Sequence, residues 1–457
     1  MNRIYKVVKC ASTGVFKAVP EFAKAQGKGK GVTKKLLAIS LVSMMTSGAA
    51  IAGDILSGVD NTAPNSNSLV VGGQNNTAGS TELDVNGVPI GTLSAVVGGF
   101  GNTASGTQSF VGGGNQNQAT ELTTVVVGGQ RNSATKQSAG VLAGSGNTAN
   151  GNRSVIGGGL NNTTSTDEAF IGAGRGNIAS GSSSAVVAGI NNMARSEASF
   201  VGGGIGNRAD GPSTFIGAGD SNFTWAGAQN SAVVAGANNQ AYGVRAFVGA
   251  GSGNEVAVVS DNSVIVGGAD NYIQGVNSAI VSGSGNSIDA ATSVIGGGIN
   301  NRITSYADSG TGAAVRTQNS VIAGGADNEI TGDAVNAVIS GGQNNIASGA
   351  HSFIGGGGGA STALGNTASG IGSVVVGGYS NQANNQYSFV GGGTRNFNDG
   401  EHSSIIGGSN NKISEQAEHA AIVGGNFNEA NNIGAFIGGG NNNNNDGEYA
   451  AIVGGTY

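Results

Sequence analysis

Residues 109–123 read SFVGGGNQNQATELT, and the next 15 residues, 124–138, read TVVVGGQRNSATKQS. Both segments have a small polar residue, then Val, a Gly-Gly pair, an Asn and an Ala at the same places. A period of 15 residues is too short to hold a core of its own, so each repeat must bury its apolar side chains against the next. The sequence therefore predicts a solenoid. The recurring Asn includes Asn76, Asn102, Asn117, Asn132, Asn147, Asn162, Asn177, Asn192, Asn207, Asn381, Asn396 and Asn411.

We number each repeat from this Asn, which is position 0. Between Asn76 and Asn443, position −3 is Gly in 22 of 23 repeats, position −6 is Val or Ile in 22, and position +2 is mostly Ala or Ile. The pattern predicts two short strands per turn, around positions −6 and +2, joined by a tight Gly-Gly turn. We expect the Asn to adopt the left-handed backbone conformation and to hydrogen-bond to the Asn of adjacent turns. The fold class is thus all-β, a β-solenoid of about 24 turns and on the order of 110 Å in length.

The first strand is apolar on both faces. Positions −7 and −5 point away from position −6, and every repeat with Phe at −7 has Gly at −5. Such balancing of volume is typical of a packed surface. We therefore predict that other copies of the chain cover this face, and the alternative is a wider monomeric coil. The predicted interface includes Phe110, Phe170, Phe200, Phe215, Phe247, Phe353, Phe389 and Phe436.

Residues 1–52 are predicted to be an export signal that is cleaved after Ala52, before Gly53. A Lys-rich segment precedes an apolar run that ends in Ala50-Ile51-Ala52 and is too short to span a bilayer comfortably. The only cysteine, Cys10, lies in this segment. Residues 53–457 form the predicted repeat domain and hold 11 of the 20 basic and 25 of the 26 acidic residues, a net charge of −14. This charge disfavours nucleic acids and anionic membranes as partners.

Two resemblances point to one secretion class. The residues MNRIYKVV at 1–8 and KAVPEFAK at 17–24 resemble the extended signal peptide region of type V secretion proteins. The repeats resemble the head of YadA-like trimeric autotransporter adhesins, with matching phrases at Ser109-Phe110-Val111-Gly112, Ser199-Phe200-Val201-Gly202 and Asn102-Thr103-Ala104-Ser105-Gly106. This resemblance implies a left-handed parallel β-roll in which three chains share one core. The family's repeat is usually 14 residues long, and its turn is plainer than Gly-Gly-x-x-Asn.

Insertions interrupt the period at about 79–93, 302–319 and 355–365, and the spacing grows to 17 residues before Asn239, Asn271, Asn345 and Asn428. Loops on a repetitive scaffold are common recognition sites, although tolerated insertions would look the same. The candidate ligand loops carry Trp225, Tyr242, Tyr306 and Arg316. The repeat continues to Tyr457. The neck, stalk and membrane anchor of the resembled family are not visible in the sequence, and we expect the chain to lack them.

We find no catalytic constellation in the sequence, and we expect neither a cofactor nor a metal. His351, His402 and His419 fall in loops without Cys partners, and Asp270 and Asp327 are interpreted as turn residues rather than Ca²⁺ ligands. Adjacent Glu-His pairs at 401–402 and 418–419 could at best form a weak adventitious metal site. A polysaccharide-acting enzyme would need clustered carboxylates, whereas acidic residues here are scattered.

The expected function is that of an adhesin head. It would be exported through the Sec machinery of a Gram-negative bacterium, displayed at the outer membrane or released, and assembled as a homotrimer. It would bind extracellular matrix, host cells or abiotic surfaces through many weak contacts. The alternatives are a monomeric two-partner-secreted haemagglutinin and the non-functional product of a truncated adhesin gene.

Overall fold

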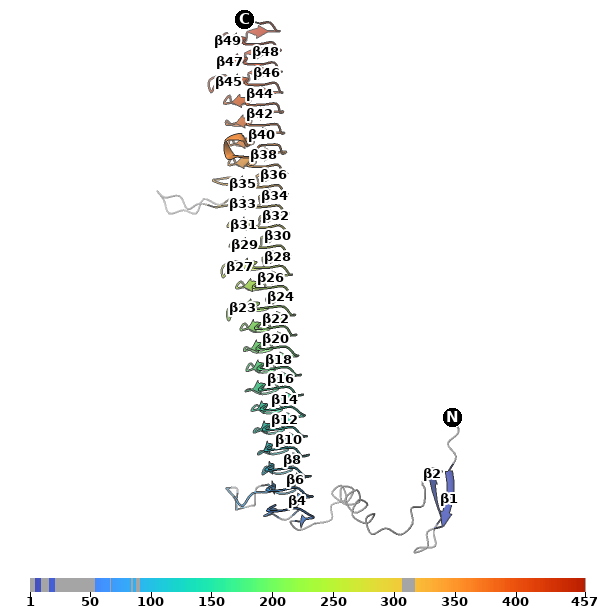
Figure 1. Cartoon of the computed structure of the whole chain (residues 1–457). Helices are drawn as coiled ribbons and strands as arrows, with labels where there is room; N and C mark the ends of the chain where they lie inside the picture. Colours follow the sequence, from blue (N-terminus) through green and yellow to red (C-terminus); the bar gives the residue numbers. More distant parts are fainter. Residues whose placement is uncertain are drawn as a thin grey trace.

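The computed structural model (Figure 1) describes residues 5–9, 16–20, 54–65, 67–83, 85–87, 91–305 and 317–456. Near the N-terminus, β1 (Tyr5–Lys9) and β2 (Phe16–Pro20) pair antiparallel. The predicted cleavage residues Ala50, Ala52 and Gly53 lie outside the described residues. Within these residues, no helix is both long enough and apolar enough to cross a membrane.

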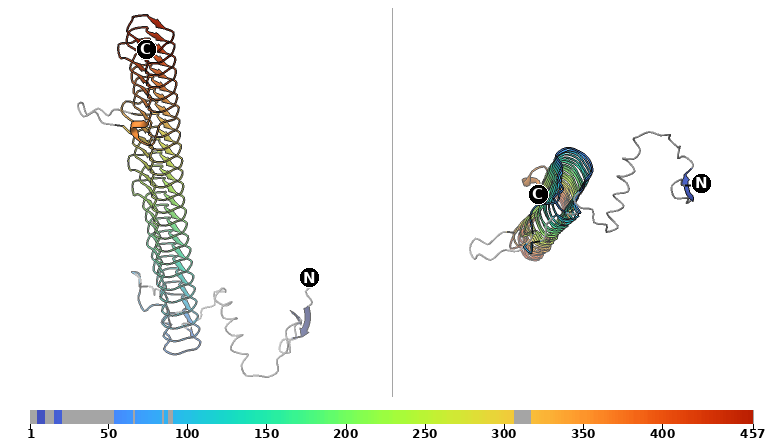
Figure 2. Two further views of the ribbon diagram at one scale, coloured as in Figure 1. Left: turned by 45° about the horizontal axis from the view of Figure 1, so that its top comes forward. Right: turned by 90° about the horizontal axis from the view of Figure 1, so that it is seen from below.

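From β3 (Asp54–Ile55) to β50 (Ala451–Ile452) the chain winds as one parallel β-solenoid of about 23 turns with a repeat of about 15 residues. Figures 1 and 2 show a straight, slender rod with the turns stacked along its axis. The predicted all-β solenoid is therefore confirmed. Among the described residues the one helical segment is the 3₁₀ turn η2 (Thr362–Leu364).

Each turn contributes one two-residue strand to each of two parallel sheets. The first-strand sheet contains positions −7 and −6, from β3 through β4 (Leu69–Val70), β6 (Ala95–Val96) and the later even-numbered strands to β50. The second-strand sheet contains positions +1 and +2, from β5 (Thr77–Ala78) through the odd-numbered strands to β49 (Asn444–Asn445). Every strand pairs in register with the equivalent strands above and below, as in β8 (Phe110–Val111) with β10 (Val125–Val126).

A third side completes each turn. Isolated parallel bridges join position −2 of successive turns, for example Asn115 with Gln130 and Gln130 with Ser145. The sequence pattern indicated two sides only, because position −2 has no fixed residue type. A single bridge residue pairs through its backbone, which leaves its side chain free to vary.

The core is a thin column enclosed by these three sides. The Val or Ile at position −6 and the residue at position +2 are buried almost throughout, as are the Asn at position 0 and the Ser or Thr at position −8. Small and β-branched residues suit this space because a 15-residue turn encloses only one layer of side chains.

Buried Asn side chains form a continuous hydrogen-bonded ladder along the rod. Asn192 donates its backbone N–H to Oδ1 of Asn177 at 2.9 Å, and its Nδ2 donates to the carbonyl oxygens of Ala188 at 3.1 Å and Gly204 at 2.9 Å. Oδ1 of Asn192 accepts the backbone N–H of Asn207 at 3.0 Å. Each side chain thus satisfies a backbone donor of the next turn and two turn carbonyls, which buried polar groups require.

The expected left-handed conformation of the Asn is wrong. The residue with positive φ is the one before it, at position −1, for example Gln116 at φ 55° and Asn191 at φ 54°. The Asn itself is needed for its amide. A further left-handed residue lies at position −9, two residues before the first strand, for example Gln108 at φ 58°.

The Gly at position −3 is required by both conformation and space. Gly189 has φ 100°, and a Cβ there would lie 2.2 Å from the carbonyl oxygen of Gly204 in the next turn and 2.4 Å from Nδ2 of Asn192. No side chain fits there without separating the turns. This explains why position −3 tolerates so little variation.

Insertions leave the ladder intact. The backbone N–H of Asn239 meets Oδ1 of Asn222 at 3.0 Å across a 17-residue turn, and the corresponding distances are 3.0 Å for Asn366 with Asn345 and 3.2 Å for Asn328 with Asn301. The extra residues are therefore accommodated outside the stacked positions. In the segment 355–365, η2 lies between the Gly-rich stretch and Asn366, whose Nδ2 still donates to the carbonyl oxygen of Gly356. The segment 302–319 is described only at its two ends.

We predict that Asn192→Ala destabilises the turns around it by about 2–4 kcal/mol, because it removes four hydrogen bonds and leaves the buried N–H of Asn207 without its acceptor. The measurement is hydrogen exchange of the amides from 177 to 207, which resolves local opening in a repeat protein. Asn191→Gly is the matched control, since Gly adopts positive φ without strain. Equal protection in Asn192→Ala and the unmodified protein would contradict the role of the ladder.

Candidate functional surfaces

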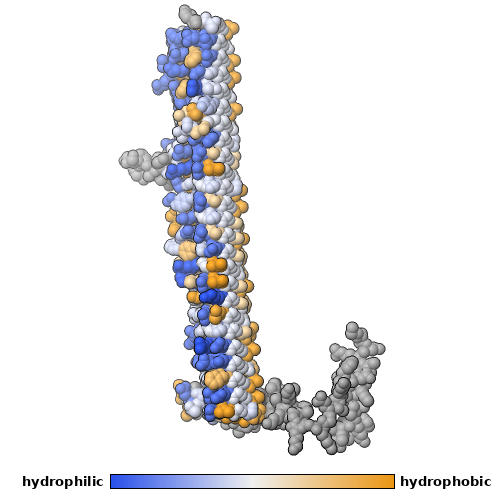
Figure 3. Space-filling view, in the orientation of Figure 1, coloured by the Kyte–Doolittle hydropathy of each residue, from blue (hydrophilic) through white to orange (hydrophobic). Residues whose placement is uncertain are grey.

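An apolar stripe, formed by positions −7 and −5, runs along the outside of the first-strand sheet. It contains no charged residue in any turn from Leu69 to Val453. Large side chains on it are exposed: Val127 is 48% exposed, Val187 42% and Phe170 41%. Figure 3 shows a line of apolar side chains along one edge of the rod, while much of the side facing the viewer is hydrophilic. The described residues of the chain therefore leave this surface uncovered.

The predicted interface phenylalanines all lie on this stripe and not in the core of their own coil. Each is half-buried or exposed: Phe110, Phe170, Phe200, Phe215, Phe247, Phe353, Phe389 and Phe436. Phe200 and Phe215, on β20 (Phe200–Val201) and β22 (Phe215–Ile216), stack with their ring centroids 5.3 Å apart and nearly parallel. The stripe is thus a ladder of aromatic and aliphatic groups at the spacing of the turns.

The structure gives a different reason for the pairing of Phe with Gly. In Phe200's turn, a Cβ on Gly202 would lie 2.2 Å from the carbonyl oxygen of Gly217 in the next turn and 3.5 Å from the Phe200 ring. The ring therefore lies beside the bare Cα of its own turn. The pairing arises within one chain and does not by itself require a partner, whereas a long exposed apolar stripe is typical of an interaction surface.

The second-strand sheet carries polar and charged side chains on its outer face. Ion pairs join neighbouring turns here, such as Lys412 with Glu429 at 2.8 Å. Such exposed pairs contribute little stability, but they mark this face as the one that water contacts. A protein that assembled through the apolar stripe would keep the second-strand face available to ligands.

Two of the candidate ligand residues, Trp225 and Tyr242, lie near other aromatic side chains on this face. Trp225 follows β23 (Phe223–Thr224) and is 41% exposed, and Tyr242 follows β25 (Gln240–Ala241). Tyr242 packs edge-on against Phe223 with 5.6 Å between the ring centroids, and its hydroxyl donates to Oε1 of Gln240. Tyr272, on β29 (Tyr272–Ile273), continues the cluster two turns further along. The sequence analysis missed Phe223 and Tyr272, which aligning position +1 across the turns would have singled out.

Glu255, on β27 (Glu255–Val256), lies between Gln240 and Tyr272 in the second-strand sheet. Burial raises the pKa of its carboxyl above the ordinary value of 4.5. Burial, and the charge of Glu255, raise the pKa of the hydroxyls of Tyr242 and Tyr272. This half-buried carboxyl between aromatic rings is the most clearly desolvated acid that the described residues offer outside an ion pair.

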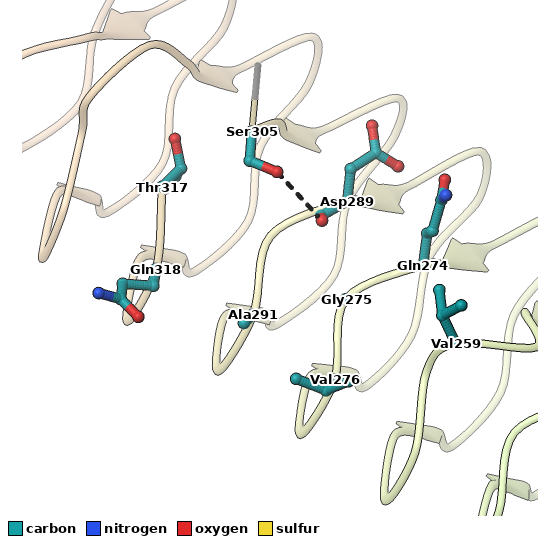
Figure 4. A pocket seen from close by; sticks show the side chains of 9 residues that line it. All are labelled: Val259, Gln274, Gly275, Val276, Asp289, Ala291, Ser305, Thr317 and Gln318. Atoms are coloured by element: carbon teal, nitrogen blue, oxygen red, sulfur yellow. Dashed lines mark hydrogen bonds between the residues drawn. The ribbon is translucent and has the colours of Figure 1, made fainter. Parts of the chain in front are cut away.

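A shallow groove of about 370 Å³ continues from this cluster towards the long insertion. Figure 4 shows the side chains of Gln274 and Asp289 pointing to one side and that of Gln318 to the other, next to Val259 and the smaller apolar residues. Ser305 donates a hydrogen bond to the carbonyl oxygen of Asp289 at 3.4 Å. The other lining residues are Gly275, Val276, Ala291 and Thr317. Tyr306 and Arg316, the remaining candidate ligand residues, lie outside the described residues.

The histidines form a surface ladder at position −9. His402 stacks on Tyr387 with a centroid distance of 5.0 Å and contacts His419 at 5.4 Å. Glu401 lies 3.5 Å from His402, and Glu418 lies 3.2 Å from His419. In the part of the chain that the structure describes, no three His, Cys, Asp or Glu side chains converge as metal ligands. His351 is separate and lies 3.4 Å from Asn336.

Comparison with known proteins identifies the first segment only. Residues 1–50 match the family model for the extended signal peptide of the type V secretion system. No curated protein matches the chain. The signal and the β-solenoid together fit an autotransporter-like protein that is exported.

We predict that Glu255→Gln stabilises its turn at neutral pH and has no such effect at about pH 3. A carboxyl whose pKa is raised in the folded state opposes folding when it is ionised, and this penalty disappears as the pH falls below the ordinary value of 4.5. The measurement is hydrogen exchange of residues 240–273 at both pH values. Equal protection of Glu255→Gln and the unmodified protein at neutral pH would contradict the assignment.

Proposed function

We propose that the chain is the head of a YadA-like trimeric autotransporter adhesin, exported by the Sec route and displayed on or released from a Gram-negative cell. The observation that carries the proposal is the uncharged apolar stripe that runs along a rod preceded by a type V secretion signal. In this proposal three copies cover their stripes against one another, as the resemblance of the repeats implies.

The physical case for self-association rests on the extent of the stripe. Monomeric soluble proteins rarely expose contiguous apolar patches beyond a few hundred Å². Val97, Val127, Leu142 and Val187 are each more than 40% exposed, and their successors continue along the rod. Because every turn repeats the same surface, a second copy in parallel register meets an equivalent group at each level.

The remaining surface suits attachment better than catalysis. The polar second-strand face and its loops would contact extracellular matrix, host cells or abiotic surfaces, with weak contacts multiplied along three chains. The net charge of −14 for residues 53–457 disfavours nucleic acids and anionic membranes. A monomeric secreted haemagglutinin remains the competing proposal, and it is favoured if the protein is a monomer in solution whose apolar stripe stays exposed to water.

The first test is the assembly state. We expect analytical ultracentrifugation of the exported protein to show a trimer, and we expect Val187→Glu combined with Val234→Glu to weaken or abolish it. Both valines are exposed in the single chain, so the charges cost little there but would be desolvated in an interface. The matched control is Gln118→Glu, at an exposed position of the second-strand sheet. A monodisperse monomer of the unmodified protein would overturn the proposal.

The second test is attachment. A heterologous strain that displays the chain should adhere to matrix-coated and abiotic surfaces more than the same strain without it. The stripe variant should lose this adhesion together with its assembly, because multivalent contacts need all three chains. Adhesion that is equal with and without the displayed chain would exclude an adhesin role.

A further inference from the structure

Phe223, Trp225, Tyr242 and Tyr272 lie on three nearby turns of the second-strand sheet and its following loops. Only 5% of the residues in the chain are aromatic, and Trp225 is its single tryptophan. The cluster is on the polar side of the rod, away from the apolar stripe. Trp225 is exposed and the other three are partly exposed, so the core does not account for them.

Two longer loops lie along the cluster, one at Trp225 and one between Tyr242 and Tyr272. The turns after β23 and β27 each contain 17 residues, and their loops begin with Trp225 and Ala257. The shorter loop of Tyr242 lies between them. Val258 and Val259 are exposed on the second of these loops. Because the rings lie on nearby turns of one sheet, a ligand that contacts all of them would follow the rod axis.

Charge on this strip is largely compensated. Arg208, on β21 (Arg208–Ala209), pairs with Asp210 and places its guanidinium 5.2 Å from the centre of the Phe223 ring. Glu255 is half-buried between Gln240 and Tyr272. Such a surface offers rings and hydrogen-bonding groups but no strong field of one sign, so it favours a neutral ligand over a charged one.

The strip is continuous with the groove of Figure 4. Oε1 of Gln274 lies 3.4 Å from the Tyr272 hydroxyl, and Gln274 and Val259 both line the groove. Asp289 and Gln318 extend the polar lining beyond Gln274. Aromatic rings at one end and amide and carboxylate groups at the other thus form one elongated surface.

We propose that this surface, from Trp225 to Gln318, binds a neutral polysaccharide chain that lies along the rod. The proposal deepens the proposed attachment function and rests on it. A pyranose ring has an apolar face of C–H bonds and a rim of hydroxyls. Its apolar face stacks on aromatic rings, whose faces carry negative potential. Its hydroxyls donate to the carboxylate of Asp289 and exchange hydrogen bonds with the amides of Gln274 and Gln318.

The chain supplies its own reporter for the test. Because Trp225 is the only tryptophan, fluorescence excited at the red edge of the absorption band, where tyrosines do not absorb, reports on this surface alone. The full exported protein is titrated with cellohexaose, chitohexaose and mannohexaose. We expect at least one of the three to shift or quench the fluorescence saturably, and Tyr242→Ala to weaken that binding at least tenfold while it keeps the reporter.

The control variant changes an aromatic residue of the same sheet that lies far from the proposed site. Phe397→Ala removes an exposed aromatic side chain from the same sheet in a distant turn, β43 (Phe397–Asn398), and should bind as the unmodified protein does. Trp225→Ala should reduce retention on the immobilised oligosaccharide. The proposal is overturned if none of the three oligosaccharides changes the fluorescence, or if Tyr242→Ala binds normally. It is also overturned if Tyr242→Ala loses binding to a matrix protein while no oligosaccharide binds.

These outcomes separate the two proposals. A trimer that adheres to matrix or abiotic surfaces but ignores all three oligosaccharides would keep the adhesin function and reject the polysaccharide site. A monomer that binds an oligosaccharide through Trp225 and Tyr242 would keep the site and reject the trimeric adhesin.

Discussion

The buried Asn ladder is the interaction on which the rest of the structure depends. Apolar burial alone would allow the thin turns to slip, because one layer of Val, Ile and Ala side chains fits a neighbouring layer in several registers. An amide that donates to a carbonyl of its own turn and to one of the next turn, and accepts the next turn's backbone N–H, does so in one register only. The Gly at position −3 brings the turns close enough for those bonds. The same alignment stacks the buried residues at positions −6 and +2 along the rod, and it also stacks the equivalent side chains on the surface.

The period of the sequence was sufficient to predict the fold, because a stacked structure repeats its constraints at a fixed spacing. It was less informative about which backbone position bears the strain. Asn is common in left-handed conformations, so the conserved spacing of Asn117 and its equivalents suggested that role, whereas Gln116 and its equivalents perform it. Position −1 is Gly, Asn or Asp in 17 of the 23 repeats from Asn76 to Asn443, and these types adopt positive φ most readily, so its backbone requirement could have been predicted from the sequence. The third side of the turn could not, because position −2 has no fixed residue type.

The candidate surfaces, like the fold, could be predicted from the sequence only in part. Charge-free positions −7 and −5 were recognisable in the sequence, since a strand alternates its faces. The cause of the Phe-Gly pairing was not, because it depends on a carbonyl of the next turn, as at Gly202. Trp225 and Tyr242 were noticed as unusual residue types. That they lie close to Phe223, Tyr272 and the groove at Gln274 could not be predicted. It depends on which residues of successive turns stack on one another, and on loops that lie side by side only in the folded rod.

The way the ladder absorbs inserted residues has an evolutionary consequence. Because Asn239, Asn328 and Asn366 keep their contacts across turns of different length, duplication or loss of a whole 15-residue unit leaves each surviving turn with an equivalent neighbour above and below. Recombination between gene segments that encode equivalent turns can therefore lengthen or shorten the rod one step at a time without passing through an unfolded intermediate. Such a molecule can adjust its reach by recombination alone, while single substitutions tune its surface independently.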